Sequence, residues 1–132
     1  MEIGEIVYDP CCGTGGFLAQ SYQHMKGKAK TALDIETLKT RTFYGREKEN
    51  LVYPITLANL VLQDIDDPYI WYGNTLTGLE IYCDLFQDAP GLFDVVLTNP
   101  PFGGKEGKDA QTKFVYKAGS INFIFTACYR QP

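Results

Sequence analysis

A glycine-rich turn near the start of the chain has the composition of a ligand-binding loop. It reads Asp-Pro-Cys-Cys-Gly-Thr-Gly-Gly-Phe-Leu over residues 9–18. Gly13, Gly15 and Gly16 let the backbone turn tightly and approach a ligand without a Cβ in the way. Asp9 would repel a pyrophosphate and attract a cationic ligand, such as an ammonium or sulfonium group. The turn ends in Phe-Leu, so it lacks the third glycine of a dinucleotide-binding loop and the Gly-Lys-Ser/Thr of a phosphate-binding loop.

A second motif, Asn-Pro-Pro-Phe, follows a buried apolar run and suits the binding of a planar amine. Pro100 and Pro101 forbid a helix and hold the chain in an extended turn. The Asn99 side chain and the Pro100 carbonyl then present two acceptors to the two hydrogens of an exocyclic amino group. Phe102 offers a flat face on which a base would stack, worth roughly 1–3 kcal/mol.

These motifs need a sheet to bring them together, and the sequence predicts a parallel one. Short runs rich in β-branched and aromatic residues are bounded by Gly, Pro, Asn or Asp. The expected strands are Glu5–Tyr8, Thr42–Gly45, Tyr69–Tyr72 and Phe93–Thr98. The expected helices are Gly16–Met25, Leu51–Ile65 and Ser120–Tyr129, while Leu79–Phe86 is ambiguous. Alternation of strands and helices predicts βαβ units and an α/β fold.

One acid is placed to bind a second part of a nucleotide-like ligand. In nucleotide-binding folds an acid at the end of the second strand holds the ribose hydroxyls. Glu47 lies just past the second expected strand, with Glu49 as its nearby competitor. Both could instead be solvated carboxylates at the start of the next helix. Pro54 falls inside that helix pattern, so we expect it near the first turn.

Composition and charge limit the class of protein. The 132 residues predict one domain, with 45% hydrophobic and 21% charged residues and no signal peptide or membrane-spanning run, so a cytoplasmic protein is expected. The net charge is −4, and no Lys or Arg occurs between Glu49 and Gly104. The segment from Gly103 to Lys117 carries four lysines. A DNA-directed activity would therefore depend on another domain or subunit for much of its phosphate contact.

The cysteines do not predict a metal site. Cys11 and Cys12 are adjacent, Cys83 and Cys128 are isolated, and no C-x-x-C pair occurs. The single histidine, His24, does not complete a zinc site with them. We expect reduced thiols and no metal.

Taken together, the two motifs resemble motifs I and IV of amino-directed DNA methyltransferases. The Gly-Thr-Gly-Gly-Phe-Leu ending resembles the modification (M) subunit of type I restriction-modification systems, in the N6-adenine family. Further segments that resemble this family are Phe43–Glu47, Leu57–Ile65 and Gly73–Leu76. The resemblance covers about Ile6 to Phe125. Cys11 and Cys12 depart from it, since small residues such as Ala are more usual there.

The resemblance implies a Rossmann-like S-adenosylmethionine-dependent methyltransferase fold with helices on both faces of a mostly parallel sheet. Residues 1–132 would form a single, partial catalytic core, truncated at both ends. The implied activity is methyl transfer from S-adenosyl-L-methionine to N6 of a flipped-out adenine in DNA. Implied partners are DNA, a specificity subunit, a second modification subunit and, as a further candidate, the restriction subunit, with no membrane.

The same resemblance implies roles for individual residues. The implied cofactor-binding residues are Asp9, Pro10, Cys11, Gly13, Thr14, Gly15, Gly16, Phe17, Glu47, Asn74, Thr75, Leu76 and Asn99. The implied catalytic residues are Asn99, Pro100, Pro101 and Phe102. Asp9 and the glycines would line the methionine part of the cofactor, Glu47 would bind the ribose, and Asn74 would contact the adenine.

Other functions fit parts of the pattern. A protein glutamine amide or an RNA guanine amino group would also present a planar amine to an Asn-Pro-Pro-aromatic turn, although those families more often end this motif in Tyr. An inactive cofactor-binding fragment that scaffolds a partner is a non-enzymatic alternative. A nucleotide-dependent dehydrogenase is disfavoured by the missing third glycine and by Asn-Pro-Pro-Phe.

Overall fold

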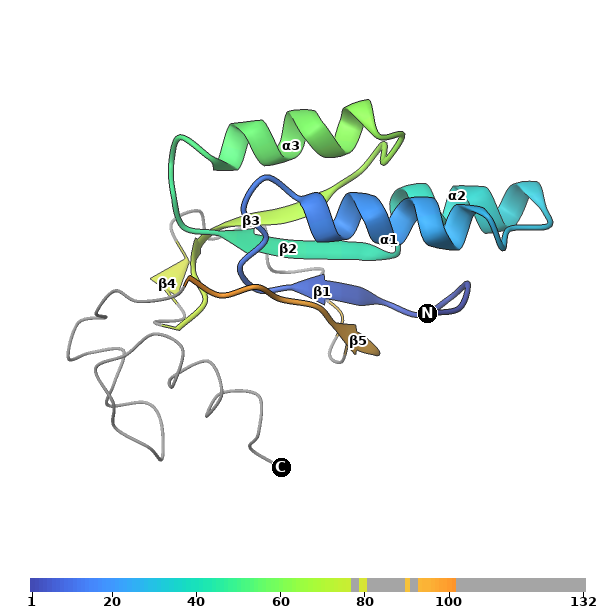
Figure 1. Ribbon diagram of the computed structural model, residues 1–132, viewed down its shortest axis with the longest axis horizontal. Helices are drawn as coiled ribbons and strands as arrows, with labels where there is room; N and C mark the ends of the chain where they lie inside the picture. Colours follow the sequence, from blue (N-terminus) through green and yellow to red (C-terminus); the bar gives the residue numbers. More distant parts are fainter. Residues whose placement is uncertain (77–78, 81–89, 91–92, 102–132) are drawn as a thin grey trace.

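The chain alternates strands and helices in the order expected of an α/β protein. The computed structural model describes residues 1–76, 79–80, 90 and 93–101 (Figure 1). Its elements are β1 (Val7–Asp9), α1 (Gly16–Lys26), α2 (Ala32–Thr40), β2 (Phe43–Glu47), α3 (Tyr53–Leu62), β3 (Tyr69–Asn74), β4 (Leu79–Glu80) and β5 (Val95–Val96). All four expected strands are present, which confirms the α/β prediction. The expected helix at Ser120–Tyr129 lies outside the described residues.

The sheet is mostly parallel, as predicted. Its strand order is β4-β3-β2-β1-β5. Strand β1 pairs in parallel with β2 on one side and with β5 on the other, and β2 pairs in parallel with β3. The short strand β4 is antiparallel to β3. Strands β2 and β3 therefore lie on one side of β1, and β5 lies on its other side. Such a switch point in strand order is where open α/β sheets bind ligands.

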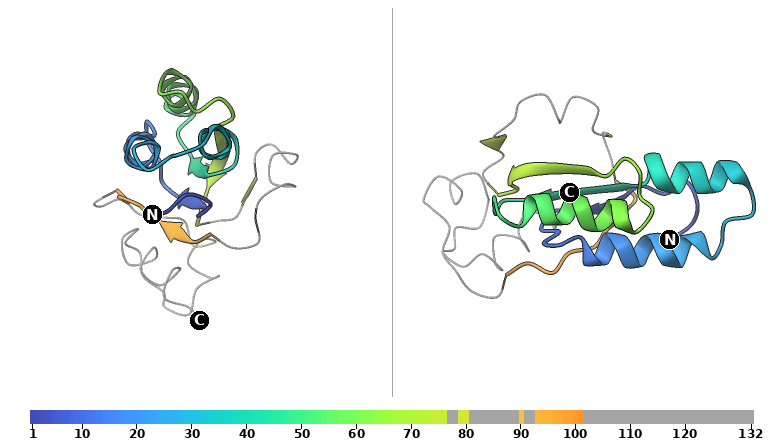
Figure 2. Two further views of the ribbon diagram at one scale, coloured as in Figure 1. Left: turned by 90° about the vertical axis from the view of Figure 1, so that its right-hand side faces the viewer. Right: turned by 90° about the horizontal axis from the view of Figure 1, so that it is seen from above.

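One face of the sheet is covered by the three described helices, which lie together on that side (Figures 1 and 2). The core between these helices and the sheet consists of Val7, Cys12, Leu18, Ala19, Tyr22, Met25, Leu38, Phe43, Leu60, Ile65 and Ile70. Several of these side chains have no exposed surface, and burial of each large apolar side chain contributes roughly 1.5–3 kcal/mol.

The opposite face carries a row of buried aromatic residues, because alternate residues of a strand point to opposite faces. Tyr8, Tyr44 and Trp71 follow the core residues Val7, Phe43 and Ile70 on their respective strands. The rings of Tyr44 and Trp71 stack with centroids 5.8 Å apart, and those of Tyr8 and Phe93 with centroids 4.4 Å apart. Apolar residues on both faces explain the nearly continuous apolar runs of these strands.

The helices differ from the predictions mainly at their ends. Helix α1 begins at Gly16 as expected. Helix α3 is shorter than the predicted Leu51–Ile65, because Asp64 takes a left-handed conformation (φ 74°) just after it. Pro54 lies in its first turn, as predicted. Within the described ranges, no helix has the length and apolar character needed to cross a membrane.

Helix α2 was not predicted from the sequence. Only Leu38 is buried along it, so its apolar periodicity is weak. A capping box starts it instead: the Asp34 N–H donates to Thr31 Oγ1 at 3.1 Å, and the Thr31 N–H donates to Asp34 Oδ2 at 2.9 Å. Thr-x-x-Asp was the available signal.

Candidate functional site

The glycine-rich turn joins β1 to α1 as a tightly closed loop. The Cys12 N–H donates to the Arg46 carbonyl of β2 at 3.0 Å, and the Gly15 N–H donates back to the Cys12 carbonyl at 2.8 Å. Gly13 (φ 53°) and Gly15 (φ 81°) both occupy the left-handed region, where a side chain would be strained. The backbone therefore requires glycine at both positions to turn from β1 into the start of α1.

Helix α3 packs against the back of this loop. The Thr56 hydroxyl donates to the Gly13 carbonyl, and Asn59 Nδ2 donates to the Thr14 carbonyl at 2.8 Å. A Cβ added at Gly15 would lie 3.1 Å from the Leu60 side chain. The Cβ position of Gly15 therefore faces the side chains of α3 in the protein interior.

A cavity of about 490 Å³ opens on the other side of the loop. Its lining residues are Asp9, Cys11, Cys12, Gly13, Thr14, Gly16, Phe17, Gln20 and Asn99. The first eight belong to β1, the loop and α1, whereas Asn99 comes from the segment after β5. The fold therefore brings the two predicted motifs to one cavity, at the end of the sheet where the parallel strands terminate (Figure 1).

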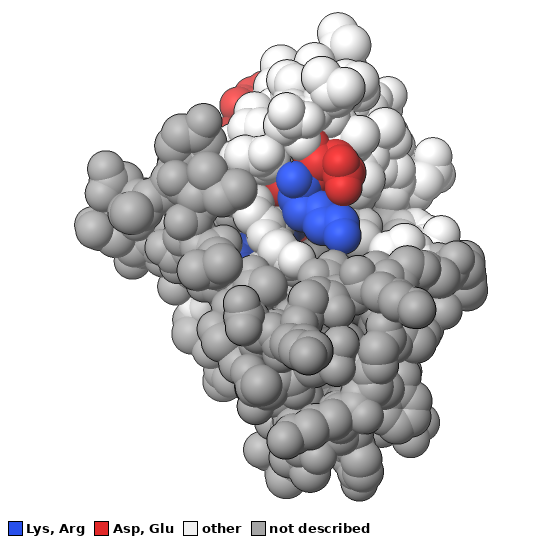
Figure 3. All heavy atoms as spheres, turned by 90° about the vertical axis from the view of Figure 1, so that its left-hand side faces the viewer, with Lys and Arg blue, Asp and Glu red and all other residues white. Residues whose placement is uncertain are grey.

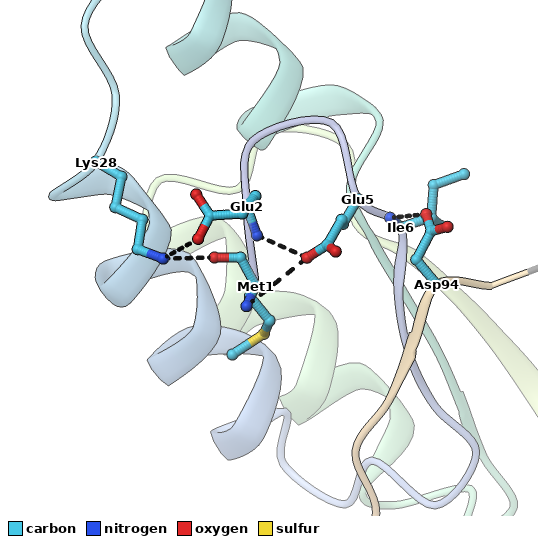
Figure 4. Close-up of polar contacts among 6 residues, drawn as sticks. All are labelled: Met1, Glu2, Glu5, Ile6, Lys28 and Asp94. Atoms are coloured by element: carbon cyan, nitrogen blue, oxygen red, sulfur yellow. Dashed lines mark hydrogen bonds and ion pairs between the residues drawn. The ribbon is translucent and has the colours of Figure 1, made fainter.

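Asn99 reaches this cavity because β5 is held alongside β1. The Ile6 N–H donates to Asp94 Oδ2 at 2.8 Å, an interaction visible in Figure 4. The Ile6 carbonyl accepts from the N–H groups of Asp94 and Val95, and the Leu97 N–H donates to the Tyr8 carbonyl at 3.0 Å. Because Leu97 is paired near the end of β1, Asn99, two residues later, lies at the end of the sheet beside the glycine-rich turn.

Figure 4 also shows how the start of the chain is tied to the loop after α1. Lys28 Nζ donates to the Met1 carbonyl and to Glu2 Oε1, both at 2.7 Å. Glu5 Oε2 accepts from the Glu2 N–H at 2.6 Å. These contacts hold the segment that leads into β1.

Asp9 is a buried acid at the cavity wall. Its side chain is only 2% exposed, and this burial raises its pKa from 3.8 to about 6. A hydrogen bond from the Cys11 N–H at 3.0 Å and the neighbouring Thr98 side chain oppose the shift, while the Glu47 charge adds to it. Asp9 forms none of the ion pairs found among the described residues. A buried carboxylate in this setting favours a cationic ligand.

The structure separates the two candidate acids of the second strand. Glu47 is the last residue of β2 and is 6% exposed, whereas Glu49 is exposed. The Glu49 N–H donates to Glu47 Oε1 at 2.8 Å, which fixes the Glu47 carboxylate at the strand end. Glu47 acts electrostatically on Asp9 and Cys11, so it lies beside the cavity although it does not line it.

The predicted adenine-binding segment lies at the end of β3. Asn74 ends the strand, and its Oδ1 accepts from the Leu76 N–H at 2.9 Å. The Thr75 hydroxyl donates to the Pro10 carbonyl at 2.5 Å, and Leu76 is buried. Thr75 thus ties the end of β3 to the start of the glycine loop.

The two cysteines of the loop do not supply a nucleophile. Both are free thiols, and Cys12 is buried. Burial raises the pKa of Cys11 to about 11 and raises that of Cys12 further, with the charges of Asp9 and Glu47 adding to both shifts. The thiols are therefore protonated at neutral pH, and Cys12 packs against Gly45, where an added Cβ would lie 3.2 Å from the sulfur.

Some predicted residues do not line the cavity, and two lining residues were not predicted. Pro100 is partly buried and Pro101 is exposed, while Phe102 and the lysine-rich segment from Gly103 to Lys117 lie outside the described residues. Cys12 and Gln20 line the cavity without having been chosen from the sequence. Gln20 is four residues after Gly16, so helical spacing was the signal for it.

The surface at this end of the molecule has mixed charge. Figure 3 views that end and shows basic side chains directly beside acidic ones in the described part of the surface. Lys48 and Glu49, which follow Glu47 at the end of β2, are both exposed.

Comparison with known proteins gives one consistent result. The N-6 DNA Methylase family model matches residues 1–126. The type I restriction enzyme EcoEI methylase subunit of Escherichia coli is 38% identical over 115 residues, which cover 86% of this chain and 22% of that protein. A chain from a solved structure of the type I R-M system has a TM-score of 0.82 and 39% identity, covering 96% of this chain and 25% of that one.

A further solved structure, the type I restriction enzyme EcoKI M protein, has a TM-score of 0.76 and 26% identity over 96% of this chain and 27% of its own. The EcoKI methylase subunit comes from Escherichia coli strain K12. The chain thus spans about a quarter of the length of the relatives it matches.

Proposed function

The chain belongs to the N-6 DNA methylase family, and we propose that it forms the catalytic core of a type I modification subunit. In this proposal it binds S-adenosyl-L-methionine and transfers the methyl group to N6 of adenine in DNA. One observation carries the proposal: Asp9, the glycine loop and Asn99 line a single cavity. A donor site and an acceptor site for methyl transfer must meet in this way.

The cavity residues fit the proposed cofactor. A volume of about 490 Å³ is within the usual range for a small-molecule site. A Cβ added at Gly13 or Gly16 would meet nothing within 4 Å, so the backbone there faces open space. Asp9 supplies a buried negative charge for the cationic methionine part. When bound, S-adenosylmethionine supplies an electrophilic sulfonium methyl group.

The proposed contacts to the ribose and the adenine of the cofactor come from residues at or just after the ends of strands. Glu47, held by the Glu49 N–H, would accept hydrogen bonds from the ribose hydroxyls. Asn74, with Thr75 and Leu76, would lie along the adenine ring. Asp9, Glu47 and Asn74 end β1, β2 and β3, which are neighbours in the sheet, so the three residues lie at adjacent strand ends.

The acceptor half of the site would be the Asn-Pro-Pro-Phe turn. A flipped-out adenine would place its amino group between Asn99 Oδ1 and the Pro100 carbonyl, which accept its two hydrogens. Phe102 would stack on the base. In the transfer, the new bond from N6 to the methyl carbon would form as the sulfur–carbon bond breaks, and the methylated nitrogen would release one proton to solvent. Alignment supplies most of the rate enhancement, because the thioether leaving group is neutral.

The partners follow from charge. A net charge of −4 gives this chain little capacity to neutralise phosphates, so we propose that a specificity subunit and a second modification subunit supply much of the DNA contact. The restriction subunit is a further proposed partner. A DNA substrate agrees with the cytoplasmic location expected from the sequence.

The experiment that tests the function is transfer of label from tritiated S-adenosylmethionine, with the proposed partner subunits present and with DNA, protein and RNA offered in separate reactions. We expect label in DNA and recovery of it as 6-methyladenine after digestion, with DNA that is already methylated as the control. Label in protein or RNA would replace DNA by one of the alternative amine substrates. Cofactor binding without transfer to any substrate would indicate an inactive cofactor-binding fragment.

A further inference from the structure

One face of α3 follows the glycine loop residue by residue. Thr56 bonds to the Gly13 carbonyl, Asn59 bonds to the Thr14 carbonyl, and Leu60 packs where a Gly15 side chain would be. The spacing of three and four residues places these side chains on the same side of a helix. Three consecutive residues of the loop therefore rest on three residues of one helix face.

These contacts determine which way the loop presents its backbone. A trans peptide directs its C=O and the following N–H in opposite directions. Because the Gly13 carbonyl points at Thr56, the Thr14 N–H points away from α3. Gly13, Thr14 and Gly16 line the cavity, whereas Gly15 does not. Helix α3 thus holds the loop in the orientation that exposes it to a ligand.

The two polar side chains differ in setting, which allows them to be tested separately. Thr56 is fully buried, and its single hydroxyl proton has two nearby acceptors, with the Gly13 carbonyl closer than the Val52 carbonyl at 3.0 Å. Loss of this donor would leave a loop carbonyl without its partner in a buried position. Asn59 is only half-buried, so its replacement disturbs the core less.

The same helix is also anchored to the proposed ribose-binding acid. The Glu49 N–H holds Glu47 Oε1, and the Glu49 carbonyl accepts from the N–H groups of Val52 and Tyr53 at 3.0 Å, where α3 begins. A short path of hydrogen bonds therefore joins Glu47 to the start of α3, and the next turns of α3 hold the glycine loop.

We propose that Thr56 and Asn59 are positioning residues for the cofactor: they hold the Gly13 and Thr14 carbonyls so that the loop fits the methionine part while α3 keeps it in register with Glu47. This inference rests on the proposed cofactor site. Neither residue touches the cavity, so both act through the loop.

The test measures the dissociation constant of S-adenosylhomocysteine by calorimetry, alongside the thermal midpoint and amide hydrogen exchange of the ligand-free chain. We expect Thr56→Val to weaken binding about tenfold, the loss of roughly one well-placed hydrogen bond. It should also speed amide exchange across residues 13–16. Thr56→Ser keeps the hydroxyl and should restore binding to within about threefold.

Thr42→Val is the matched control for Thr56. The buried Thr42 hydroxyl also donates to a backbone carbonyl, that of Thr37 at 3.0 Å, but Thr42 lies just before β2, at the opposite end of that strand from Glu47. We expect this variant to lower the thermal midpoint and to leave the dissociation constant unchanged. Equal weakening by Thr42→Val and Thr56→Val would overturn the inference, because both would then act through stability alone.

Asn59→Asp tests the second contact with less disturbance of the core than Thr56→Val. It removes the donor and places a carboxylate against the Thr14 carbonyl, so we expect about fivefold weaker binding. Gln63→Glu makes the same charge change at the end of the same helix and should leave binding unchanged.

The outcomes separate this inference from the proposed function. Failure of the unaltered chain to bind S-adenosylhomocysteine would overturn the proposed cofactor site and the inference with it. Binding by the unaltered chain that survives both Thr56→Val and Asn59→Asp would overturn the inference and leave the proposed function standing. If Thr56→Val does not fold, Thr56→Ser and Asn59→Asp still decide the question.

Discussion

The glycine loop and the Asn-Pro-Pro corner line one cavity, but they are held in different ways. The loop bonds to Arg46 of β2, to its own Cys12 carbonyl, and to Thr56 and Asn59 of α3. The contacts that place the corner come before it, where Ile6 meets Asp94 and Tyr8 meets Leu97. Asn99 itself is exposed at the cavity.

The two halves of the proposed reaction site are therefore built in different ways. The donor half is formed by the fold itself, with a buried acid and a braced backbone. The acceptor half is carried to the same place by one strand pairing. Substitutions in the loop should therefore change cofactor binding, whereas substitutions in the corner and in β5 should change transfer.

Asn99→Ala gives the largest expected effect and divides the two halves most clearly. It removes one of the two acceptors for the amine, so we expect methyl transfer to fall at least about 10²–10³-fold, as when one aligned polar group is lost from an active site. The dissociation constant of the cofactor, measured by calorimetry, should stay within about twofold. An equally large loss of cofactor binding would contradict the division.

Asp9→Asn should weaken the cofactor and strengthen the fold. Burial raises the Asp9 pKa from 3.8 to about 6, so the ionised form is disfavoured in the folded state. The Asp9 penalty is therefore present above pH 6 and disappears as the pH falls below 3.8. The variant should gain stability at pH 7.5, up to about 3 kcal/mol, in denaturant unfolding. A gain that is as large at pH 3.5 would refute this origin.

The same substitution should also remove a pH dependence of binding. A cationic ligand favours ionised Asp9, so cofactor affinity in the unaltered chain should fall as the pH drops through about 6, at most about tenfold per pH unit. In Asp9→Asn this fall should be absent and affinity at pH 7.5 roughly 10–100-fold lower. A fall that persists in the variant would contradict the assignment of this pH dependence to Asp9.

Gly15→Ala tests the bracing of the loop. The left-handed backbone at φ 81° is strained for alanine by about 1–2 kcal/mol, and the new Cβ would press on Leu60. We expect a matching loss of unfolding free energy and about tenfold weaker cofactor binding. Gly16→Ala is the stability control, because its Cβ would meet nothing within 4 Å and would stabilise the helix. Equal loss of stability in both variants would argue against strain at Gly15.

Asp94→Ala should produce the smallest effect, and unlike Gly15→Ala it should change methyl transfer rather than cofactor binding. It removes the hydrogen bond to the Ile6 N–H that helps to hold β5 against β1. We expect a loss of about 0.5–1.5 kcal/mol in stability and a few-fold lower transfer rate, with unchanged cofactor affinity. Asp66→Ala, which removes an exposed partner of Lys39, is the control. Weaker cofactor binding in Asp94→Ala would show that the two halves are not independent.

The sequence predicted the strands well because their apolar runs record burial on both faces of the sheet. Val7 and Tyr8 point to opposite faces, and both are buried. It failed at α2, whose start depends on Thr31 and Asp34 rather than on an apolar stripe. It also placed Glu47 just after β2, although the strand extends to include it.

The candidate site was predictable where a residue type has few physical uses. The glycines of the turn, the acid at a strand end and the two consecutive prolines could be recognised from the sequence, and Gly13 and Gly15 indeed have positive φ. The positions of Thr56 and Asn59 were not, because their roles depend on which element packs against the loop. Only the fold shows that Gly15 faces Leu60 while Gly16 faces the cavity.

A structure of the chain with bound S-adenosylhomocysteine tests the central claim most directly, since it locates the sulfur atom that would carry the methyl group. We predict that the sulfur lies in the cavity lined by Asp9, Gly13 and Asn99, on the side open to Asn99. Binding in a second cavity of the described residues, which is lined by Glu2 and Lys28, or a pose that turns the sulfur away from Asn99, would contradict the account.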